Sequence, residues 1–281
     1  MDKIIKIGNS ILQHGKENDR VYLMSLDLKD TELIQEEINK LILTNKYTKV
    51  FAKVDKKVEE LFSQQGYARE AIVPELFGNG KDGVFLAKYF SDERKVDEHF
   101  ELCQKVLQTA INKKKAEKSN VSISKLPKGY TFRKVVPEDA VEVSILYQTV
   151  FQTYPFPVHE AEYILQTMKD NVIYFGIWHE TKLVALSSIE AADKYKNAEM
   201  TDFAVLEEYQ GKDFALLLLN EMEKCLKEMN YQTAYTIARA KSYGMNITFA
   251  KSGYTYAGTL TNNTQISGNI ESMNVWYKTV M

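Results

Sequence analysis

Hydrophobic positions in the second half of the chain follow strand and helix periods in turn. The stretch YTFRKV, from Tyr130, predicts a strand, and PEDAVEVSILYQTVFQTY predicts a helix with Pro137 near its first turn. A second helix is expected around HEAEYILQTM, after the break made by Pro155 and Pro157. The next segment, NVIYFGIWHETKLVALSSIEA, predicts two strands joined by a short polar turn.

The remaining pattern alternates between single strands and helices. A third strand, AEMTDFAVL, leads through the turn QGKDFA into a helix. TAYTIA predicts another strand, KSYGMNITFAKSG a short helix, and YTYAGTL with SMNVWYKTV a closing pair of strands. The order β-α-α-β-β-β-α-β-α-β-β predicts an α/β fold with a mixed sheet flanked by helices.

The segment NKKKAEKSNVSISKLPKGY, residues 112–130, interrupts the periodic pattern. It is charged, contains serines, and ends in a proline and a glycine, which is typical of a linker. A chain of 281 residues also exceeds the size of roughly 100–200 residues that is usual for one domain. We therefore predict an N-terminal α/β domain over residues 1–118, a linker over 119–130 and a second domain over 131–281.

A weak internal repeat indicates that the two halves are related. KVFAKVDKKVEELFSQQGYAREA parallels AYTIARAKSYGMNITFAKSGYTYAG, and both contain F-x-x-x-G-Y, beginning at Phe62 and at Phe249. Two unrelated strand–helix–strand units are the alternative, but we favour a degenerate duplication. The first copy has no counterpart of QGKDFA, so we expect a cofactor in the second half alone.

The composition is that of an ordinary globular protein, with 44% hydrophobic and 26% charged residues. The formal net charge of −2 provides no basic surface for nucleic acid or an anionic membrane, so neither is expected as a partner. Cys103 and Cys225 fall within amphipathic helical patterns, which favours buried thiols over a disulfide framework or a metal site. No segment suits a signal peptide or a bilayer span, and we expect a cytoplasmic protein.

The turn QGKDFA connects a strand directly to a helix and so directs several backbone N–H groups toward one point. The helix dipole adds positive potential there, which suits a pyrophosphate. The motif is neither G-x-G-x-x-G nor a P-loop, which argues against NAD and ATP. A glycine turn before an amphipathic helix is also a common connection that binds nothing.

Three strands, then V-x-x-x-x-Q-G-x-x-x-A, then a strand, a helix and G-Y resemble the GNAT acetyltransferase superfamily over about residues 130–281. The segments ARAKSYGMN and NNTQISGNIESMNVWYK further resemble the β-lysine N-acetyltransferase family, whose product, Nε-acetyl-β-lysine, is a compatible solute. The resemblance implies a GNAT fold, preceded by a smaller degenerate GNAT-like α/β domain. It also implies acetyl-CoA as co-substrate, without a metal, and a role in osmoadaptation.

The superfamily's acetyl-CoA turn is Q/R-x-x-G-x-G/A, and here Asp213 stands where the central glycine is expected. A carboxylate beside a pyrophosphate is unfavourable, although at an exposed helix start it can cap N–H groups, and Lys212 offsets its charge. We expect weakened binding, not lost binding. The implied acetyl-CoA contacts are Phe203, Val205, Gln210, Gly211, Lys212, Asp213, Phe214, Ala215 and Ser242.

The chemistry of acetyl transfer requires a neutral amine. Deprotonating a lysine-like amine of pKa near ~10.4 at pH 7 costs roughly 4–5 kcal/mol, whereas a thiol leaving group near ~8.5 needs about 2 kcal/mol. The strand AEMTDFAVL carries two acids, and strand alternation predicts Glu199 on one face and Asp202 on the other. The resemblance implies Glu199 as general base, with a solvated strand-end glutamate as the alternative. Asp202 is expected either to hold the substrate ammonium or to pair with a lysine.

The tyrosine that usually protonates the thiolate in the superfamily is replaced by Phe249 in TFAKSGY. Tyr243, Ser242 or water are candidates for the missing acid, or the thiolate leaves unaided. Considered as a bare sequence feature, Ser242 is a helix N-cap.

The loops FQTYPFPVHE and TNNTQISGNIES are expected to form the acceptor pocket, with Tyr154 and Phe156 in its wall. Packing within the loop is the alternative for these aromatics. Glu190 and Glu271 are candidate partners of a substrate ammonium and Arg239 of a carboxylate, each with a surface charge as the alternative.

Together these features predict an acetyl-CoA-dependent N-acetyltransferase that acetylates the terminal amine of a small diamino acid, with β-lysine the leading acceptor. A catalytically silent acyl-CoA-binding sensor and a protein or peptide N-acetyltransferase are the alternatives.

Overall fold

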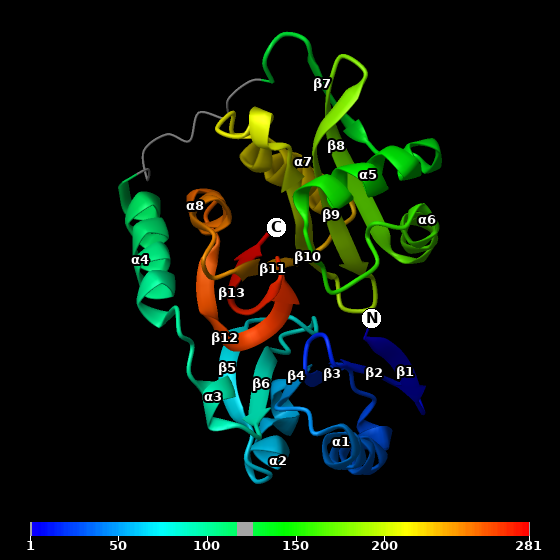
Figure 1. Cartoon of the computed structure of the whole chain (residues 1–281), viewed down its shortest axis with the longest axis vertical. Coiled ribbons are helices and arrows are strands. Elements are labelled where there is room, and N and C mark those ends of the chain that lie inside the picture. Colours follow the sequence, from blue (N-terminus) through cyan, green and yellow to red (C-terminus); the bar gives the residue numbers. More distant parts are fainter. Residues whose placement is uncertain (1, 117–125, 281) are drawn as a thin grey trace.

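The computed structural model describes residues 2–116 and 126–280, and all of its strands belong to one sheet. The strand order along this sheet is β1-β2-β3-β4-β6-β5-β12-β13-β11-β10-β9-β8-β7. The strands of the N-terminal half lie toward one end of the molecule, and the first strands of the C-terminal half lie toward the other (Figure 1). The predicted α/β fold with a mixed sheet and flanking helices is confirmed.

The N-terminal half contains six strands and the helices that connect or follow them. Its elements are β1 (Lys3–Ile7), β2 (Ser10–Gly15), β3 (Arg20–Ser25), η1 (Leu28–Asp30), α1 (Thr31–Asn45), β4 (Lys49–Asp55), η2 (Lys56–Val58), α2 (Glu59–Ser63), β5 (Ala68–Val73), β6 (Gly83–Tyr89), α3 (Asp92–Lys95) and α4 (Phe100–Ala116).

The C-terminal half has the element order that the sequence predicts. Its elements are β7 (Tyr130–Lys134), η3 (Pro137–Asp139), α5 (Ala140–Val150), α6 (Ala161–Asp170), β8 (Val172–His179), β9 (Lys182–Ala192), β10 (Asn197–Val205), η4 (Glu207–Tyr209), α7 (Phe214–Glu228), β11 (Thr233–Arg239), α8 (Tyr243–Lys251), β12 (Thr255–Ile266) and β13 (Asn269–Thr279).

The two halves share one strand topology. The order β1-β2-β3-β4-β6-β5 has the same pairing directions as β8-β9-β10-β11-β13-β12, including one parallel pair in each half, β3 with β4 and β10 with β11. Among residues 2–116, which the structure describes, there is no counterpart of β7, α5 or α6. This repeated order supports the proposed degenerate duplication.

Strands β5 and β12 join the halves in an antiparallel pair at Ala71 and Gly258. Gly258 has a φ of +147°, and a Cβ there would lie 2.0 Å from the carbonyl oxygen of Glu70. A side chain is therefore excluded at the position where the halves meet, and glycine permits the close approach.

The hydrophobic core also crosses between the halves. One cluster combines Tyr22, Phe51 and Phe85 of the N-terminal half with Tyr235 and Met273 of the C-terminal half. The N-terminal half is therefore packed against the other as part of one structure.

Helix α4 closes the predicted first domain but packs against α8 of the second (Figure 1). Lys114 on α4 donates to the backbone carbonyl of Tyr254 at 2.6 Å. The boundaries at 118 and 130 stay predictions, and residues 117–125 of the proposed linker region lie outside the described residues. None of the described helices combines the length and apolarity that crossing a membrane requires.

Candidate active site

Strands β10 and β11 separate in the middle of the C-terminal half. They pair in parallel at residues 197–199 and 233–235, and no pairing between them is recorded beyond these positions in the described structure. The ladder of β10 with β9 shifts register between Thr201 and Ala204, where Asp202 has a left-handed backbone with a φ of +56°. This bulge bends β10 away from its parallel neighbour.

The bulge overturns the predicted alternation along this strand. Glu199 and Asp202 were expected on opposite faces, but both line the same cavity. Because a bulge inserts a residue out of the two-residue period, the side chains after it no longer keep the faces that alternation assigns.

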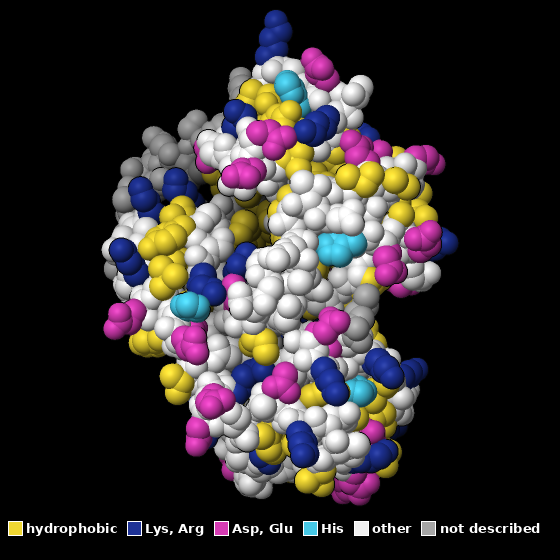
Figure 2. Space-filling model, in the orientation of Figure 1, with side chains coloured by type: hydrophobic (Ala, Val, Ile, Leu, Met, Phe, Trp, Pro, Cys, Tyr) yellow, Lys and Arg dark blue, Asp and Glu magenta, His cyan; other side chains and the backbone are white. Residues whose placement is uncertain are grey.

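A cavity of about 290 Å³ lies at this opening, and both halves form its wall. Glu190, Glu199 and Asp202 contribute acidic groups from β9 and β10, and the N-terminal half contributes Arg20 and Lys53. Figure 2 shows hydrophobic side chains recessed in a hollow near the centre of one face, close to α8. Other lining residues include Tyr22, Phe51, Tyr154, Phe156, Tyr163, Tyr174, Phe203, Arg239, Phe249, Asn263 and Thr264.

Glu190 and Glu199 lie directly opposite each other in the antiparallel ladder of β9 and β10. Burial and the adjacent Glu190 carboxylate raise the pKa of Glu199 to about 7. Glu190 has an exposed side chain because it borders the open cavity, yet the surrounding protein still limits its solvation and raises its pKa. One of the two acids is therefore a proton acceptor suited to neutral pH.

Two further groups interact with Glu190 and Glu199: Tyr235 on β11 and Lys53 on β4 of the N-terminal half. The Lys53 ammonium donates a hydrogen bond to the Tyr235 hydroxyl at 3.2 Å. Burial opposes the charge of Lys53, but Tyr22, Tyr235, Glu199 and Glu190 together raise its pKa well above the ordinary value. Lys53 in turn lowers the pKa of Glu199 and so partly offsets the effect of Glu190.

Asp202 is held by three hydroxyl groups. Tyr154 and Ser188 each donate to one of its carboxylate oxygens, and Thr201 donates at 3.3 Å. Burial raises the pKa of Asp202, while these hydrogen bonds act in the opposite direction. The predicted lysine partner is absent among the described ion pairs, and the carboxylate faces the cavity in a fixed position.

The turn between β10 and α7 is exposed from Gln210 to Asp213. Gly211 has a φ of +75° and Asp213 a φ of +58°, so both adopt left-handed backbone conformations. The side chain of Asp213 forms no cap hydrogen bond, contrary to the capping role considered above. An α-helix leaves its first N–H groups unpaired, and those of Phe214 and Ala215 therefore remain available to an anion.

Helix α8 presents the other residues considered for proton transfer. The Ser242 hydroxyl accepts from the Met245 N–H at 3.3 Å and so acts as the N-cap. Tyr243 is 36% exposed at the first position of the helix and does not line the cavity. Phe249 is fully buried, lines the cavity, and packs edge-on against Phe203 with ring centroids 5.6 Å apart.

The acceptor residues divide into two groups. Tyr154, Phe156 and Glu190 line the cavity, whereas Glu271 does not. Glu271 is 3% exposed and binds both Nε and Nη2 of Arg239, at 2.9 and 2.8 Å, and also the Lys241 ammonium at 3.1 Å. Because these two cations already neutralise its charge, the geometry does not support Glu271 as a partner of the substrate ammonium.

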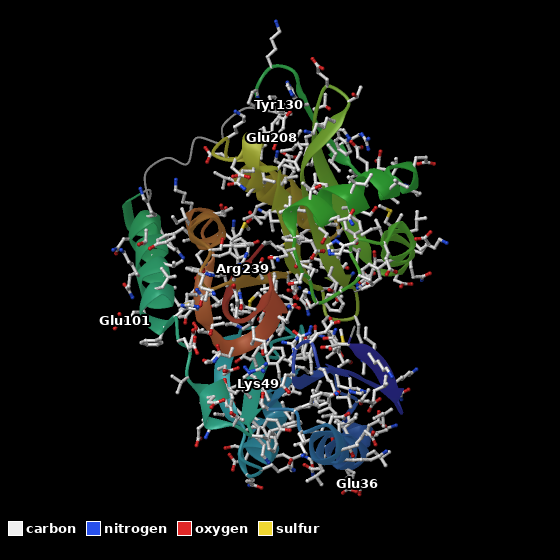
Figure 3. All side chains as sticks on the ribbon, in the orientation of Figure 1. Glu36, Lys49, Glu101, Tyr130, Glu208 and Arg239 are labelled. Carbon is white, nitrogen blue, oxygen red and sulfur yellow. The ribbon has the colours of Figure 1, made fainter. Side chains whose placement is uncertain are left out.

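Arg239 does line the cavity and lies near the middle of the molecule, whereas Glu208, beside the exposed turn, lies toward the outer end (Figure 3). Its pairing with Glu271 occupies the guanidinium edge that a carboxylate usually takes. Arg20, Tyr22 and Lys53 were missed by the sequence predictions, because no local motif links the N-terminal strands to the site. Within residues 2–116 and 126–280, no group of three or more His, Cys, Asp or Glu is arranged to hold a metal.

The chain is similar in sequence to known acetyltransferases. Residues 143–254 match the model of the acetyltransferase (GNAT) family. The chain is 44% identical over 278 residues to the beta-lysine N(6)-acetyltransferase of Methanococcus maripaludis, with 99% of each chain covered. It is 34% identical over 227 residues to the beta-lysine N(6)-acetyltransferase of Methanosarcina mazei, covering 75% of this chain and 83% of that one.

A third relative is the N-acetyltransferase YodP of Bacillus subtilis. It is 32% identical over 220 residues, which cover 78% of this chain and 76% of that protein. Each of the three aligned lengths exceeds the length of residues 130–281, so all three similarities extend into the N-terminal half.

Proposed function

The chain belongs to the acetyltransferase (GNAT) family, and on that premise we propose that it transfers the acetyl group of acetyl-CoA to the terminal amine of β-lysine. The product would be the compatible solute Nε-acetyl-β-lysine, formed in the cytoplasm. The observation that carries the proposal is the cavity beside the parted strands, lined by Glu190, Glu199 and Asp202, in a chain similar over 99% of its length to a protein of that activity.

Acetyl-CoA enters this proposal as the co-substrate that the family uses. Its pyrophosphate fits the exposed turn at residues 210–215, where helix N–H groups and Gly211 provide an anion site. Its pantetheine arm fits the separation of β10 from β11, where backbone groups at Phe203 and Val205 have no strand partner on that side. The thioester then reaches the cavity that Glu199 lines. Ser242, whose hydroxyl caps α8, is proposed to contact the pantetheine arm.

Glu199 is the proposed general base. In its deprotonated form it takes the proton of the substrate ammonium, and the neutral amine then attacks the thioester carbonyl. A C–N bond forms, the C–S bond breaks, and coenzyme A leaves as a thiolate that takes up a proton. Because Phe249 has no hydroxyl, that proton comes from solvent or from another group, for which Tyr243 stays a prediction.

The acceptor is proposed to be held by complementary charges. Glu190 and Asp202 offer carboxylates to its two ammonium groups, and Tyr154 fixes the orientation of Asp202. Phe156 closes the apolar part of the wall beside the carbon chain. A site that pairs each polar group rejects analogues that lack one of them far more strongly than a lost methylene would allow.

We expect kcat/KM to fall in the order β-lysine, α-lysine, cadaverine. In α-lysine one ammonium is moved by one carbon, and cadaverine lacks the carboxylate. The measurement is thiol release from acetyl-CoA with the three acceptors under one condition. Equal values for all three, or a preference for a peptide lysine, would contradict the β-lysine assignment while leaving the acetyltransferase assignment intact.

Asp213→Gly is expected to keep the fold and to tighten acetyl-CoA binding about fivefold, because a contact between exposed charges amounts to about 1 kcal/mol in water. Glycine also adopts the left-handed backbone of this position without strain. Calorimetric titration of acetyl-CoA measures the change.

Glu75→Gly is the matched control for this titration. Glu75 is also an exposed acid with a left-handed backbone, with a φ of +55°, but it lies in the N-terminal half. Its replacement removes the same charge and should leave acetyl-CoA affinity unchanged. Weaker binding by Asp213→Gly would show that Asp213 contributes to the cofactor site.

A further inference from the structure

Arg20, at the start of β3, is a buried cation with an unused hydrogen-bonding edge. Its side chain is 4% exposed and lines the cavity. Nη1 donates to the backbone carbonyl of Asn263 and, at 3.2 Å, to the Thr264 hydroxyl. Nε is buried without a partner, and Nη2 makes no hydrogen bond to any residue that the structure describes. The edge formed by Nε and Nη2 is therefore free.

The neighbouring buried cations of the same half differ from Arg20 in having acidic partners. Lys49 pairs with Glu70 at 3.0 Å, and Arg94 pairs with Asp19 at 3.3 Å. Within the described part of the chain, Arg20 has no carboxylate within 4.0 Å. Arg20, Lys49 and Arg94 together therefore carry one positive charge more than their acidic partners, and this charge lies on Arg20 at the cavity wall. A buried charge without a counter-ion is strongly unfavourable.

Arg239 shows what the unused edge of Arg20 can hold. Both arginines line the cavity, and Arg239 binds the two oxygens of Glu271 through its Nε and Nη2. This side-on pairing is a favoured geometry between guanidinium and carboxylate groups. The Arg20 guanidinium lies over the Tyr22 ring, 5.2 Å from its centroid, but its Nε and Nη2 have no hydrogen-bond partner among the described residues, which leaves this edge for a ligand carboxylate.

We propose that Arg20 binds the carboxylate of the amino-acid acceptor, which makes the N-terminal half part of the acceptor site. The inference rests on the proposed function and assigns the carboxylate to Arg20 in place of Arg239. The acids Glu190, Glu199 and Asp202 lie on the C-terminal side of the same cavity. The N-terminal half therefore presents two cations, Arg20 and Lys53, to a cavity into which the C-terminal half presents these three carboxylates, as a zwitterionic diamino acid requires.

Asn263 provides a second unpaired group beside Arg20. Its side chain is 1% exposed and lines the cavity, and its Oδ1 has no hydrogen-bond partner. An unpaired buried acceptor next to an unpaired buried donor suits a head group that carries both an ammonium and a carboxylate. In β-lysine one methylene separates the carbon that carries this ammonium from the carboxyl carbon.

The test compares β-lysine with pentane-1,4-diamine, which is β-lysine without its carboxyl group. In Arg20→Met we expect kcat/KM for β-lysine to fall about 100-fold or more, because the substrate carboxylate loses a charged, bidentate partner. The value for pentane-1,4-diamine should change by less than about threefold, since this acceptor has no carboxylate to bind. Arg20→Lys keeps the charge without the fork and should give an intermediate ratio.

Arg94→Met is the matched control. Arg94 also donates from its guanidinium to a β12 carbonyl, that of Asn262 at 2.7 Å, but it does not line the cavity. This variant should change kcat/KM for both acceptors by the same factor. Thermal melting checks that each variant is folded, and if Arg20→Met does not fold, the two acceptors are compared in Arg20→Lys, for which a smaller selective loss with β-lysine is expected.

The outcomes separate this inference from the proposed function. Suppose that the wild-type enzyme acetylates β-lysine. If Arg20→Met then lowers kcat/KM equally for both acceptors, or for neither, Arg20 does not bind the carboxylate. If the wild-type enzyme fails to acetylate β-lysine at all, the proposed function is wrong, and this inference is overturned with it.

Discussion

Glu199→Gln is expected to lower kcat near pH 7 by about 100-fold or more, because a positioned general base contributes about 10²–10⁴-fold to a proton-transfer step. The loss should shrink at alkaline pH, where the free amine becomes plentiful without a base. Acetyl-CoA affinity should change little, since the proposed pyrophosphate and pantetheine contacts, at residues 210–215 and at Phe203 and Val205, do not include Glu199. The measurement is the pH profile of kcat for both proteins at saturating acetyl-CoA and acceptor.

The same substitution is expected to leave the thermal midpoint unchanged or raised. Glu199 lies directly opposite Glu190, and like charges at such a position are unfavourable for the sheet. Glu223→Gln is the control, because Glu223 is a buried glutamate that pairs with Lys278 at 2.6 Å outside the cavity. A Glu199→Gln enzyme with the wild-type pH profile would exclude Glu199 as the base.

The fold was predictable because its strands and helices have clear periods. The amphipathic α7, with Leu218, Met222 and Leu226 buried, and the apolar strand β9 each show one unambiguous pattern. The turn at Gly211 was also predictable, because a glycine before a helix has a specific conformational role. Local sequence is sufficient where local physics determines the structure.

The geometry at Asp202 was not predictable from the same kind of pattern. A bulge changes the faces of a strand without changing its composition, and aspartate tolerates the left-handed backbone that the bulge requires. The prediction therefore separated Glu199 from Asp202, and the structure brings them to one cavity. The sequence does not indicate that a polar residue within a strand has a positive φ, and only the three-dimensional structure shows it.

The contribution of the N-terminal half depends on contacts that are distant in sequence. Lys53 meets Tyr235 across 182 positions and Arg20 meets Asn263 across 243. These residues sit in ordinary strand patterns, KVFAKVD and RVYLMS, with no motif that indicates a site. The pairing of Arg239 with Glu271 was not predictable either, because the sequence alone does not show which acid of the last strands lies beside Arg239.

Lys53→Met is expected to move the acid limb of the kcat profile to higher pH by about one pH unit, because an opposite charge nearby lowers a carboxyl pKa by about 1–3 units. In the wild-type protein, burial and Glu190 raise the pKa of Glu199 to about 7, and Lys53 counteracts this rise. Without Lys53 the pKa of Glu199 increases further. A larger fraction of the base is then protonated at pH 7, and kcat falls there but recovers as the pH rises.

Glu190→Gln tests the same coupling with the opposite sign. Removing the carboxylate opposite Glu199 removes a like charge, so the pKa of Glu199 should fall and the acid limb should move to lower pH. Lys56→Met is the control. Lys56 directly follows β4, the strand that carries Lys53, but its side chain is half exposed and pairs with Asp82. Profiles of kcat from pH 5 to pH 10 for all three variants measure the shifts. Shifts in one direction for both Lys53→Met and Glu190→Gln, or none for either, would show that Glu199 does not set the acid limb. Opposite shifts would identify Glu199 as the titrating base and would show that a residue of the N-terminal half adjusts its pKa.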